Sequence, residues 1–218
     1  METELSNVVS IYEKIGIYFS KTRPKPWTWI QEFLDSVPSN SDILDIGCGN
    51  GRNMSDIRHK FTGVDNCNSF IDICKKKGLN AIKTDMTDLP FEDNTFDAII
   101  SIASFHHLAT AERRIASLEE IDRVLKPGGR MLLSVWSINQ SHTKKLDFEY
   151  GDNFVPWKNK NGENLGDRFY YIFNNKELND LITKHTSMEI KSWFWDYGNE
   201  IVELVKFDKL DPNTRVKN

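Results

Sequence analysis

The chain has 218 residues, of which 39% are hydrophobic, so it can bury one substantial core but is short for two. Its 28 basic and 32 acidic residues give a formal charge of -4, which excludes a general electrostatic attraction for nucleic acid. A polyanionic substrate would therefore need a local basic face or a partner subunit.

The N-terminal segment predicts neither a signal peptide nor a membrane span, because charged side chains interrupt residues 1–20 at Glu2, Glu4, Glu13 and Lys14. We therefore expect a soluble intracellular protein, cytoplasmic with the nucleus as the alternative, and no membrane partner. The cysteines are odd in number and lack the C-x-x-C spacing of zinc and redox sites, so we expect reduced thiols and no bound metal. They are Cys48, Cys67 and Cys74.

Between about residues 42 and 135, short β-branched runs alternate with amphipathic stretches, a pattern typical of right-handed βαβ units on a parallel sheet. The expected strands cover residues 42–46, 61–64, 81–84, 96–102 and 130–136. Helices are expected around Met54 and Ile57, over residues 69–77 and over residues 111–125, with Pro127-Gly128-Gly129 ending the last. The run 96–102 is almost continuously apolar, which indicates a central strand.

The second half of the chain starts with a polar stretch, residues 137–168, which we expect to form a long excursion on the substrate side of the sheet. A helix over 176–185 and an antiparallel hairpin of 188–195 and 200–207 follow. Residues 208–218 are expected to be a flexible tail. We predict one α/β domain over residues 1–207 with the class I, Rossmann-like methyltransferase fold, a seven-stranded, mostly parallel sheet with a C-terminal antiparallel hairpin.

A glycine-rich turn, Asp45-Ile46-Gly47-Cys48-Gly49-Asn50-Gly51, follows the first expected strand. Glycines let the backbone approach a ligand closely. A dinucleotide fingerprint needs its third glycine where this chain has Arg52, so the spacing disfavours NAD. Asp45 stands at the usual methyltransferase position, where it can orient the loop or accept hydrogen bonds from the cationic methionyl end of S-adenosylmethionine.

Two further acidic residues follow the second and third expected strands. Asp65 is placed to accept both ribose hydroxyls, and Asp85 with Met86 to hold the adenine amino group and cover the ring. Each has a plain alternative, since Asp65 suits a helix N-cap and Met86 suits core packing. Their joint order at successive strand ends favours S-adenosylmethionine. The expected cofactor-binding residues are Asp45, Gly47, Gly49, Asn50, Gly51, Asp65, Asp85, Met86 and Ser101.

Motifs outside the glycine turn narrow the substrate. They are, in chain order, Tyr18-Phe19-Ser20-Lys21-Thr22-Arg23-Pro24-Lys25-Pro26-Trp27, Ile102-Ala103-Ser104-Phe105-His106-His107, Glu112-Arg113-Arg114, Trp136-Ser137-Ile138-Asn139-Gln140, Asn153-Phe154-Val155-Pro156-Trp157 and Arg168-Phe169-Tyr170-Tyr171. From about Tyr12 to Phe207 the chain resembles the eukaryotic tRNA wobble-uridine carboxymethyl methyltransferases, the family that includes the methyltransferase domain of an AlkB homologue. The resemblance implies a stand-alone enzyme that methylates the carboxylate of 5-carboxymethyluridine in the tRNA anticodon loop.

This chemistry mainly needs alignment and exclusion of water, because the carboxylate is already ionised and the sulfonium methyl is already activated. Arginine suits a carboxylate. The resemblance places Arg23 in a helical cover, residues 1–40, where it orients cofactor or substrate. His106 and His107 follow the central strand at a substrate-facing position, with a helix cap or core packing as the alternative. The expected catalytic residues are Arg23, His106 and His107, and Arg23 is also an expected cofactor-binding residue.

Several cations and aromatic residues are candidates for binding the tRNA. Arg113 and Arg114 lie in the first turn of a helix, a poor place for cations unless an anion is near, although a solvated face is the competing interpretation. Aromatic rings can stack an extruded base, with core packing as the alternative. The expected substrate-binding residues are Arg113, Arg114, Trp136, Trp157, Arg168 and Tyr170.

The resemblance also implies a small zinc-binding activator protein as a heterodimer partner. The expected edge strand supports docking there, because an unpaired edge can be extended by another chain, and its residues are Ala81, Ile82, Lys83 and Thr84. We expect the isolated chain to be poorly soluble and nearly inactive. The alternatives are a methyltransferase of a small molecule and a non-catalytic cofactor-binding subunit of another methyltransferase.

Overall fold

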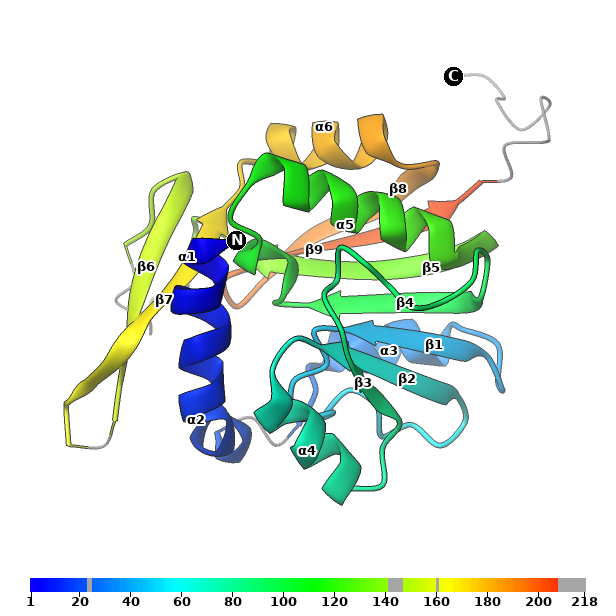
Figure 1. Cartoon of the computed structure of the whole chain (residues 1–218). Helices are drawn as coiled ribbons and strands as arrows, with labels where there is room; N and C mark the ends of the chain where they lie inside the picture. Colours follow the sequence, from blue (N-terminus) through cyan, green and yellow to red (C-terminus); the bar gives the residue numbers. More distant parts are fainter. Residues whose placement is uncertain (23–24, 141–146, 160, 208–218) are drawn as a thin grey trace.

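The computed structural model describes residues 1–22, 25–140, 147–159 and 161–207, and its centre is a seven-stranded sheet (Figure 1). The strands are β1 (Asp42–Ile46), β2 (Lys60–Asp65), β3 (Ala81–Lys83), β4 (Phe96–Ile102), β5 (Leu125–Trp136), β8 (Met188–Asp196) and β9 (Asn199–Lys206). Their order is β3-β2-β1-β4-β5-β9-β8, with β9 antiparallel to both neighbours and the other pairs parallel. The predicted class I fold is confirmed.

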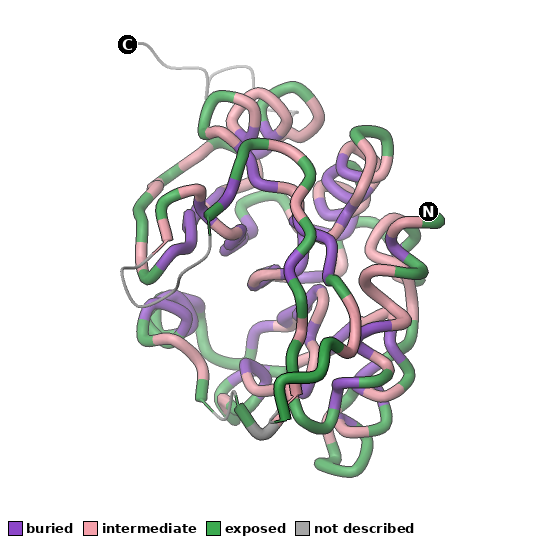
Figure 2. Tube along the Cα trace, turned by 90° about the vertical axis from the view of Figure 1, so that its left-hand side faces the viewer, coloured by how far each residue is buried: buried purple, intermediate pink, exposed green. Residues whose placement is uncertain are grey.

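Helices cover both faces of this sheet. On one face α3 (Thr28–Asp35) buries Ile30 and Phe33 against apolar side chains of the strands. On the other face α5 (Ala111–Val124) and α6 (Asn175–His185) contribute to a larger apolar cluster. As expected of a strand covered on both sides, every residue of β4 except Asp97 is buried. Figure 2 shows the buried stretches toward the middle of the molecule and the exposed ones in its outer loops.

The helix expected around Met54 and Ile57 is wrong, because residues 51–59 run through turns without helical structure. Met54 is buried but Ile57 is 99% exposed, so the two do not form one apolar face. Local side-chain hydrogen bonds compete with helix formation in this segment. The Asn50 side chain accepts from the backbone N–H of Arg52. The glycine turn therefore leads into further turns rather than into a helix.

The sequence did not predict a second, two-stranded sheet, formed by β6 (Gly151–Lys158) and β7 (Asn164–Ile172). The strands pair antiparallel within the stretch that we expected to be an irregular excursion. β6 alternates between exposed and more buried positions, but its outward face is partly polar and includes Pro156, which hides the strand pattern. β7 lies against the N-terminal helices, where its Leu165 packs beside Ile11, Tyr12 and Ile15.

The N-terminal segment forms a nearly continuous helix of α1 (Glu2–Glu4), the π-helical turn η1 (Leu5–Val9) and α2 (Ser10–Lys21). In Figure 1 this helix runs between the β6–β7 hairpin and α4 (Asn68–Lys76). Within the described ranges, no helix combines the length and apolar content that crossing a membrane requires.

The Glu13 carboxylate holds α2 against the start of α4, because its oxygens accept from the backbone N–H groups of Asn68 at 2.6 Å and Ser69 at 2.9 Å. These bonds satisfy two of the N–H groups that a helix start leaves unpaired. The two bonds therefore hold the N-terminal helix against α4.

Candidate active site

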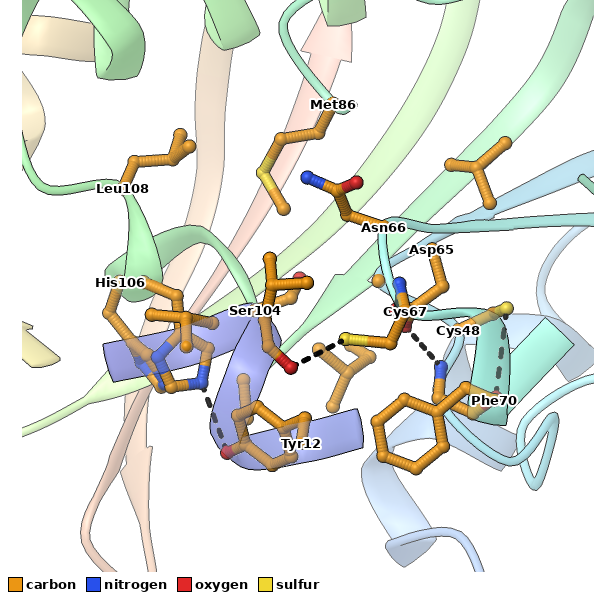
Figure 3. A pocket seen from close by; sticks show the side chains of 18 of the residues that line it. Tyr12, Cys48, Asp65, Asn66, Cys67, Phe70, Met86, Ser104, His106 and Leu108 are labelled. Atoms are coloured by element: carbon orange, nitrogen blue, oxygen red, sulfur yellow. Dashed lines mark hydrogen bonds between the residues drawn. The ribbon is translucent and has the colours of Figure 1, made fainter. Parts of the chain in front are cut away.

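A cavity lies beyond the carboxyl ends of β1, β2, β4 and β5, and Figure 3 shows side chains that line it. This is the end of a parallel sheet at which ligands bind in open α/β folds. The N-terminal helix contributes Tyr12 and Phe19 to the wall, and β7 contributes Arg168 and Tyr170. In Figure 3, Asp65, Asn66 and Met86 lie on one side of the pocket and His106 lies on the opposite side.

The glycine turn after β1 forms part of the cavity wall. Gly47 adopts a φ of 72°, and a Cβ atom there would collide with the side chain of Ser104. Gly49 adopts a φ of 52° and has nothing within 4 Å of the place where a Cβ would stand. Gly51 does not line the cavity and packs closely against Leu79. Gly49 thus leaves room for a ligand, whereas Gly47 and Gly51 avoid clashes with Ser104 and Leu79.

Asp45 lies at the end of β1, fully buried beneath this turn rather than on the cavity wall. Neither of its carboxylate oxygens has a hydrogen-bond partner among the described residues. Burial raises the pKa of Asp45 to about 7, against the opposing effects of the charge on Arg52 and of the nearby Asn53 side chain. Because a buried carboxylate is costly to ionise, a cationic ligand bound at the turn would favour the charged form of Asp45.

Asp65 ends β2 and lines the cavity beside the turn. Its Oδ2 accepts from the backbone N–H of Gly49 at 2.9 Å, and its Oδ1 from that of Cys67 at 2.9 Å. Burial raises the pKa of Asp65 although these two bonds oppose the shift. Each oxygen keeps a second lone pair for hydroxyl donors. The helix-cap alternative does not describe Asp65, because the first N–H groups of α4 bond to Glu13.

Asp85 follows β3 and belongs to an ionic network that reaches the N-terminal helix. Arg113 donates to Asp85 Oδ2 at 2.7 Å and to Glu4 Oε2 at 2.8 Å. Burial opposes ionisation, but hydrogen bonds from Thr87 and from Arg113 hold the pKa of Asp85 below its usual value. Asp85 and Met86 both line the cavity. Arg113, a predicted tRNA contact, joins the N-terminal helix to the end of β3 and also lines the cavity.

The two histidines lie in the short helix η2 (Phe105–His107) after β4, and their ring nitrogens have different hydrogen-bond partners. His107 donates from Nδ1 to the Phe169 carbonyl at 2.7 Å, so its Nε2 accepts from the Tyr12 hydroxyl at 3.2 Å. His106 Nδ1 accepts from the backbone N–H of Trp136 at 2.9 Å. The proton of a neutral His106 therefore sits on Nε2, which has no partner in the described part of the chain.

Both histidine rings are kept neutral by their surroundings. Burial lowers the pKa of His107 to about 4 and that of His106 well below its usual range. The nearby charge of Arg168 acts in the same direction on both rings. At neutral pH His106 thus presents an uncharged N–H donor.

Arg168 places a buried guanidinium on the cavity wall, with only 5% of the residue exposed. Its guanidinium carbon lies 4.9 Å from the ring centre of Trp157 and 5.3 Å from that of Tyr170. Tyr170 in turn stacks on Trp136 with centroids 4.1 Å apart. No ion pair among the described residues includes Arg168, and its Nε has no hydrogen-bond partner there. A buried cation of this kind suits an anionic ligand.

Most of the expected site residues border the cavity, but several do not. Those on the wall are Gly47, Gly49, Asn50, Asp65, Asp85, Met86, His106, His107, Arg113, Trp136, Arg168 and Tyr170. Those off the wall are Asp45, Gly51, Ser101, Arg114 and Trp157. Arg23 lies outside the described residues.

Two of the residues off the wall have other contacts. Ser101 is fully buried, with its hydroxyl 2.9 Å from that of Ser104. The Arg114 guanidinium lies over the Tyr171 ring at 3.6 Å and donates to the Leu108 carbonyl. Arg114 therefore faces away from the cavity.

The lining residues that the sequence interpretation missed include Glu4, Tyr12, Asn53 and Asn199. Glu4 and Tyr12 contact Arg113 and His107, which are about a hundred residues away in the chain. Asn199 lies in the expected hairpin turn, where asparagine is common for local reasons. No local signal marks any of them as functional.

Comparison with known proteins places the chain among methyltransferases. A family model described as "Methyltransferase domain" matches residues 44–133. The tRNA (carboxymethyluridine(34)-5-O)-methyltransferase of Schizosaccharomyces pombe is 34% identical over 205 residues, covering 84% of this chain and 90% of that protein. The tRNA (carboxymethyluridine(34)-5-O)-methyltransferase ALKBH8 of Macaca fascicularis is 43% identical over 65% of this chain. The enzyme of the same name from Xenopus tropicalis is 31% identical over 93% of this chain. The chain spans only 22% and 41% of those two proteins.

Solved structures agree on the fold. An S-adenosylmethionine-dependent methyltransferase from Methanosarcina mazei superposes with a TM-score of 0.66 at 23% identity, covering 84% of this chain and 99% of that one. A putative methyltransferase from Haloferax volcanii was solved in complex with the Trm112 methyltransferase activator. It superposes with a TM-score of 0.68 at 15% identity, covering 94% of this chain and 99% of that one.

Proposed function

The chain belongs to the tRNA (carboxymethyluridine) methyltransferase family, and we propose that it transfers a methyl group from S-adenosylmethionine to the carboxylate of 5-carboxymethyluridine at the tRNA wobble position. The observation that carries the proposal is Arg168, the buried guanidinium on the cavity wall whose Nε–H is unpaired within the described residues. Its planar fork matches a carboxylate. The expected product is the methyl ester.

The donor side of the cavity fits S-adenosylmethionine. Gly49 leaves open the space beside the turn, and Asp65 keeps lone pairs for the ribose hydroxyls. The Asp45 carboxylate, buried beneath the turn, would attract the cationic methionyl end through its charge. Asp85 and Met86 would hold the adenine. We also retain Arg23, outside the described residues, for orienting the ligands. When bound, S-adenosylmethionine supplies an activated methyl group on a sulfonium, which an ionised carboxylate accepts without loss of a proton.

The acceptor side would hold the carboxylate between Arg168 and the Nε2–H of His106. The neutral state of His106 supports a role as donor rather than base, and methylation of an ionised carboxylate requires no base. The chain thus has to align the carboxylate and exclude water. In this proposal residues 1–207 act as one domain, residues 1–40 cover the cavity, and residues 137–168 contribute to the acceptor wall.

We further propose a heterodimer with a small zinc-binding activator, docked on the outer edge of β3. β3 is the last strand on its side of the sheet, and Ile82 is 37% exposed there. Such an edge can accept a strand of another protein. The Haloferax volcanii neighbour is described as a complex with the Trm112 activator, which supports a partner of this class.

The proposed activity can be tested directly. The chain, with and without a Trm112-type activator, is incubated with methyl-labelled S-adenosylmethionine and tRNA from cells that lack the methyl ester, and the digested nucleosides are identified. We expect label in the ester of 5-carboxymethyluridine, with much more label when the activator is present. Label in free small acids but none in tRNA would favour a small-molecule methyltransferase and overturn the proposal.

A further inference from the structure

Asn199 carries a buried acceptor on the cavity wall that no part of the proposed methyl transfer uses. The residue is 2% exposed and begins β9. Its Nδ2 donates to the Asp196 carbonyl at 3.1 Å, and because a carbonyl can only accept, this bond fixes which way the amide points. The Oδ1 atom then has no partner among the described residues.

The topology puts Asn199 on the acceptor side of the cavity. The glycine turn follows β1 and Asp65 ends β2, whereas β9 lies beyond β5 in the opposite direction along the sheet. In the β5–β9 pairing Asn199 is directly opposite Trp136, whose backbone N–H bonds to His106. Asn199 is therefore a neighbour of the substrate-facing histidine rather than of the cofactor turn.

The chemistry of Asn199 complements that of the residues proposed to hold the carboxylate. His106 Nε2 and Arg168 Nε are donors, and Asn199 Oδ1 is an acceptor. A carboxylate offers only acceptors, so the Asn199 oxygen cannot form a hydrogen bond with it. The Asn199 oxygen instead suits an N–H or O–H donor on another part of the same substrate.

The aromatic pair between these groups indicates which part that is. Arg168 lies against Tyr170, Tyr170 stacks on Trp136, and Asn199 is the cross-strand neighbour of Trp136. The donors and the acceptor thus flank one aromatic stack. A planar ring with an acidic substituent on one edge and an N–H on another edge matches this arrangement.

We propose that Asn199 accepts a hydrogen bond from N3–H of the uracil ring and makes the site selective for uracil over cytosine. This inference rests on the proposed function. Neutral uracil carries a hydrogen on N3, whereas neutral cytosine presents a lone pair there, which would face the lone pairs of Asn199 Oδ1. A buried polar group left unpaired by the wrong substrate is the usual source of strong discrimination.

The test uses the full chain with its activator and synthetic anticodon stem-loops that carry 5-carboxymethyluridine, 5-carboxymethylcytidine or 2′-deoxy-5-carboxymethyluridine. The readout is kcat/KM for methyl-ester formation. We expect wild type to prefer the uridine over the cytidine by about 100-fold or more. Asn199→Ala should lower the rate on uridine and reduce this preference to less than about tenfold.

Gln140→Ala is the matched structural control, because Gln140 bonds to the carbonyls of Ser137 and Gly198 in the same hairpin region but does not line the cavity. It should leave the preference unchanged, and S-adenosylmethionine affinity should be unchanged in all variants. An undiminished preference in Asn199→Ala would overturn the inference while the proposed function stands. The 2′-deoxy substrate gives a second test. If its kcat/KM with wild type is as low as that of the uridine substrate with Asn199→Ala, the donor is the 2′-hydroxyl and the inference is also overturned. A wild type inactive on every stem-loop would overturn both proposals.

Discussion

The backbone N–H of Trp136 donates to Nδ1 of His106 over 2.9 Å, and this bond fixes the histidine tautomer that faces the cavity. β5 ends at Trp136, and η2 follows β4, so the bond depends on the pairing of these two central strands. The neighbouring ring of His107 has both nitrogens engaged. The fold therefore distinguishes two adjacent histidines that look equivalent in the sequence.

Replacing His106 should impair the reaction through loss of a neutral donor. We expect His106→Ala to lower kcat/KM on tRNA about 10- to 100-fold, and His106→Gln, which restores an N–H group, to recover part of the loss. Because the pKa of His106 lies well below its usual range, wild-type activity should show no loss from histidine protonation between pH 8 and 6. A fall in activity around pH 6.5 that disappears in His106→Gln would contradict this.

Arg168 should matter for substrate binding but not for stability. An unpaired buried cation costs desolvation energy, so Arg168→Met is expected to fold with an unfolding free energy at least as high as that of wild type. Its kcat/KM on tRNA should nevertheless fall about 100-fold or more, with S-adenosylmethionine affinity retained. Urea unfolding, calorimetry and the methyl-transfer assay check the three quantities. Arg58→Met, which removes two ion pairs away from the cavity, with Asp35 and Asp56, serves as the control and should leave activity unchanged.

Asp45 should destabilise the ligand-free protein at neutral pH. Its pKa is about 7 when folded and about 4 when unfolded, so between these values the native state binds more protons than the unfolded state. Stability contributed by this group therefore falls as pH rises from about 4 to 7. At pH 8 Asp45→Asn should be more stable than wild type by up to about 4 kcal/mol, and the difference should shrink at pH 5.

The same substitution should weaken S-adenosylmethionine binding at least about tenfold, because the cationic ligand loses its carboxylate. Asp42→Asn, at the opposite end of β1, is the matched control. Calorimetric titration and urea unfolding at the two pH values measure both effects. A variant that is less stable than wild type at pH 8, or that binds the cofactor normally, would refute the assigned role.

Local patterns were sufficient for most of the sheet but not for the site. The strands β1 to β5 and the terminal hairpin were predicted because each carries its own apolar run between turn residues. The β6–β7 hairpin was not predicted, because the outward positions of β6 include Pro156 and polar residues, which hide the strand pattern. Arg113 was assigned to tRNA because a cation in a first helical turn suggests an anion, and the structure supplies that anion from Glu4 and Asp85, far away in the sequence.

The Glu4–Arg113 ion pair should secure the N-terminal helix over the cofactor side of the cavity. Both side chains are largely buried, and Arg113 also holds Asp85. We expect Glu4→Gln to weaken S-adenosylmethionine binding about 3- to 10-fold. A double-mutant cycle with Arg113→Gln should give a coupling of about 1–2 kcal/mol in the unfolding free energy. Glu2→Gln, exposed on the same helix, should change neither quantity.

The outer edge of β3 offers a way to separate activator docking from folding. Gly63 N–H donates to the Asn80 carbonyl and Thr84 N–H to the Asp65 carbonyl, so even-numbered positions bond to β2. Since alternate residues of a strand turn their backbone groups to opposite sides, the N–H of Lys83 faces the open edge.

Lys83→Pro therefore removes a donor from the edge while leaving the bonds to β2 in place. We expect it to abolish stimulation by the activator and co-purification with it, while the affinity of the isolated chain for S-adenosylmethionine stays within about twofold of wild type. Lys83→Ala, which keeps the backbone donor, should bind the activator normally. If Lys83→Pro forms the heterodimer as well as Lys83→Ala does, the activator docks elsewhere on the chain.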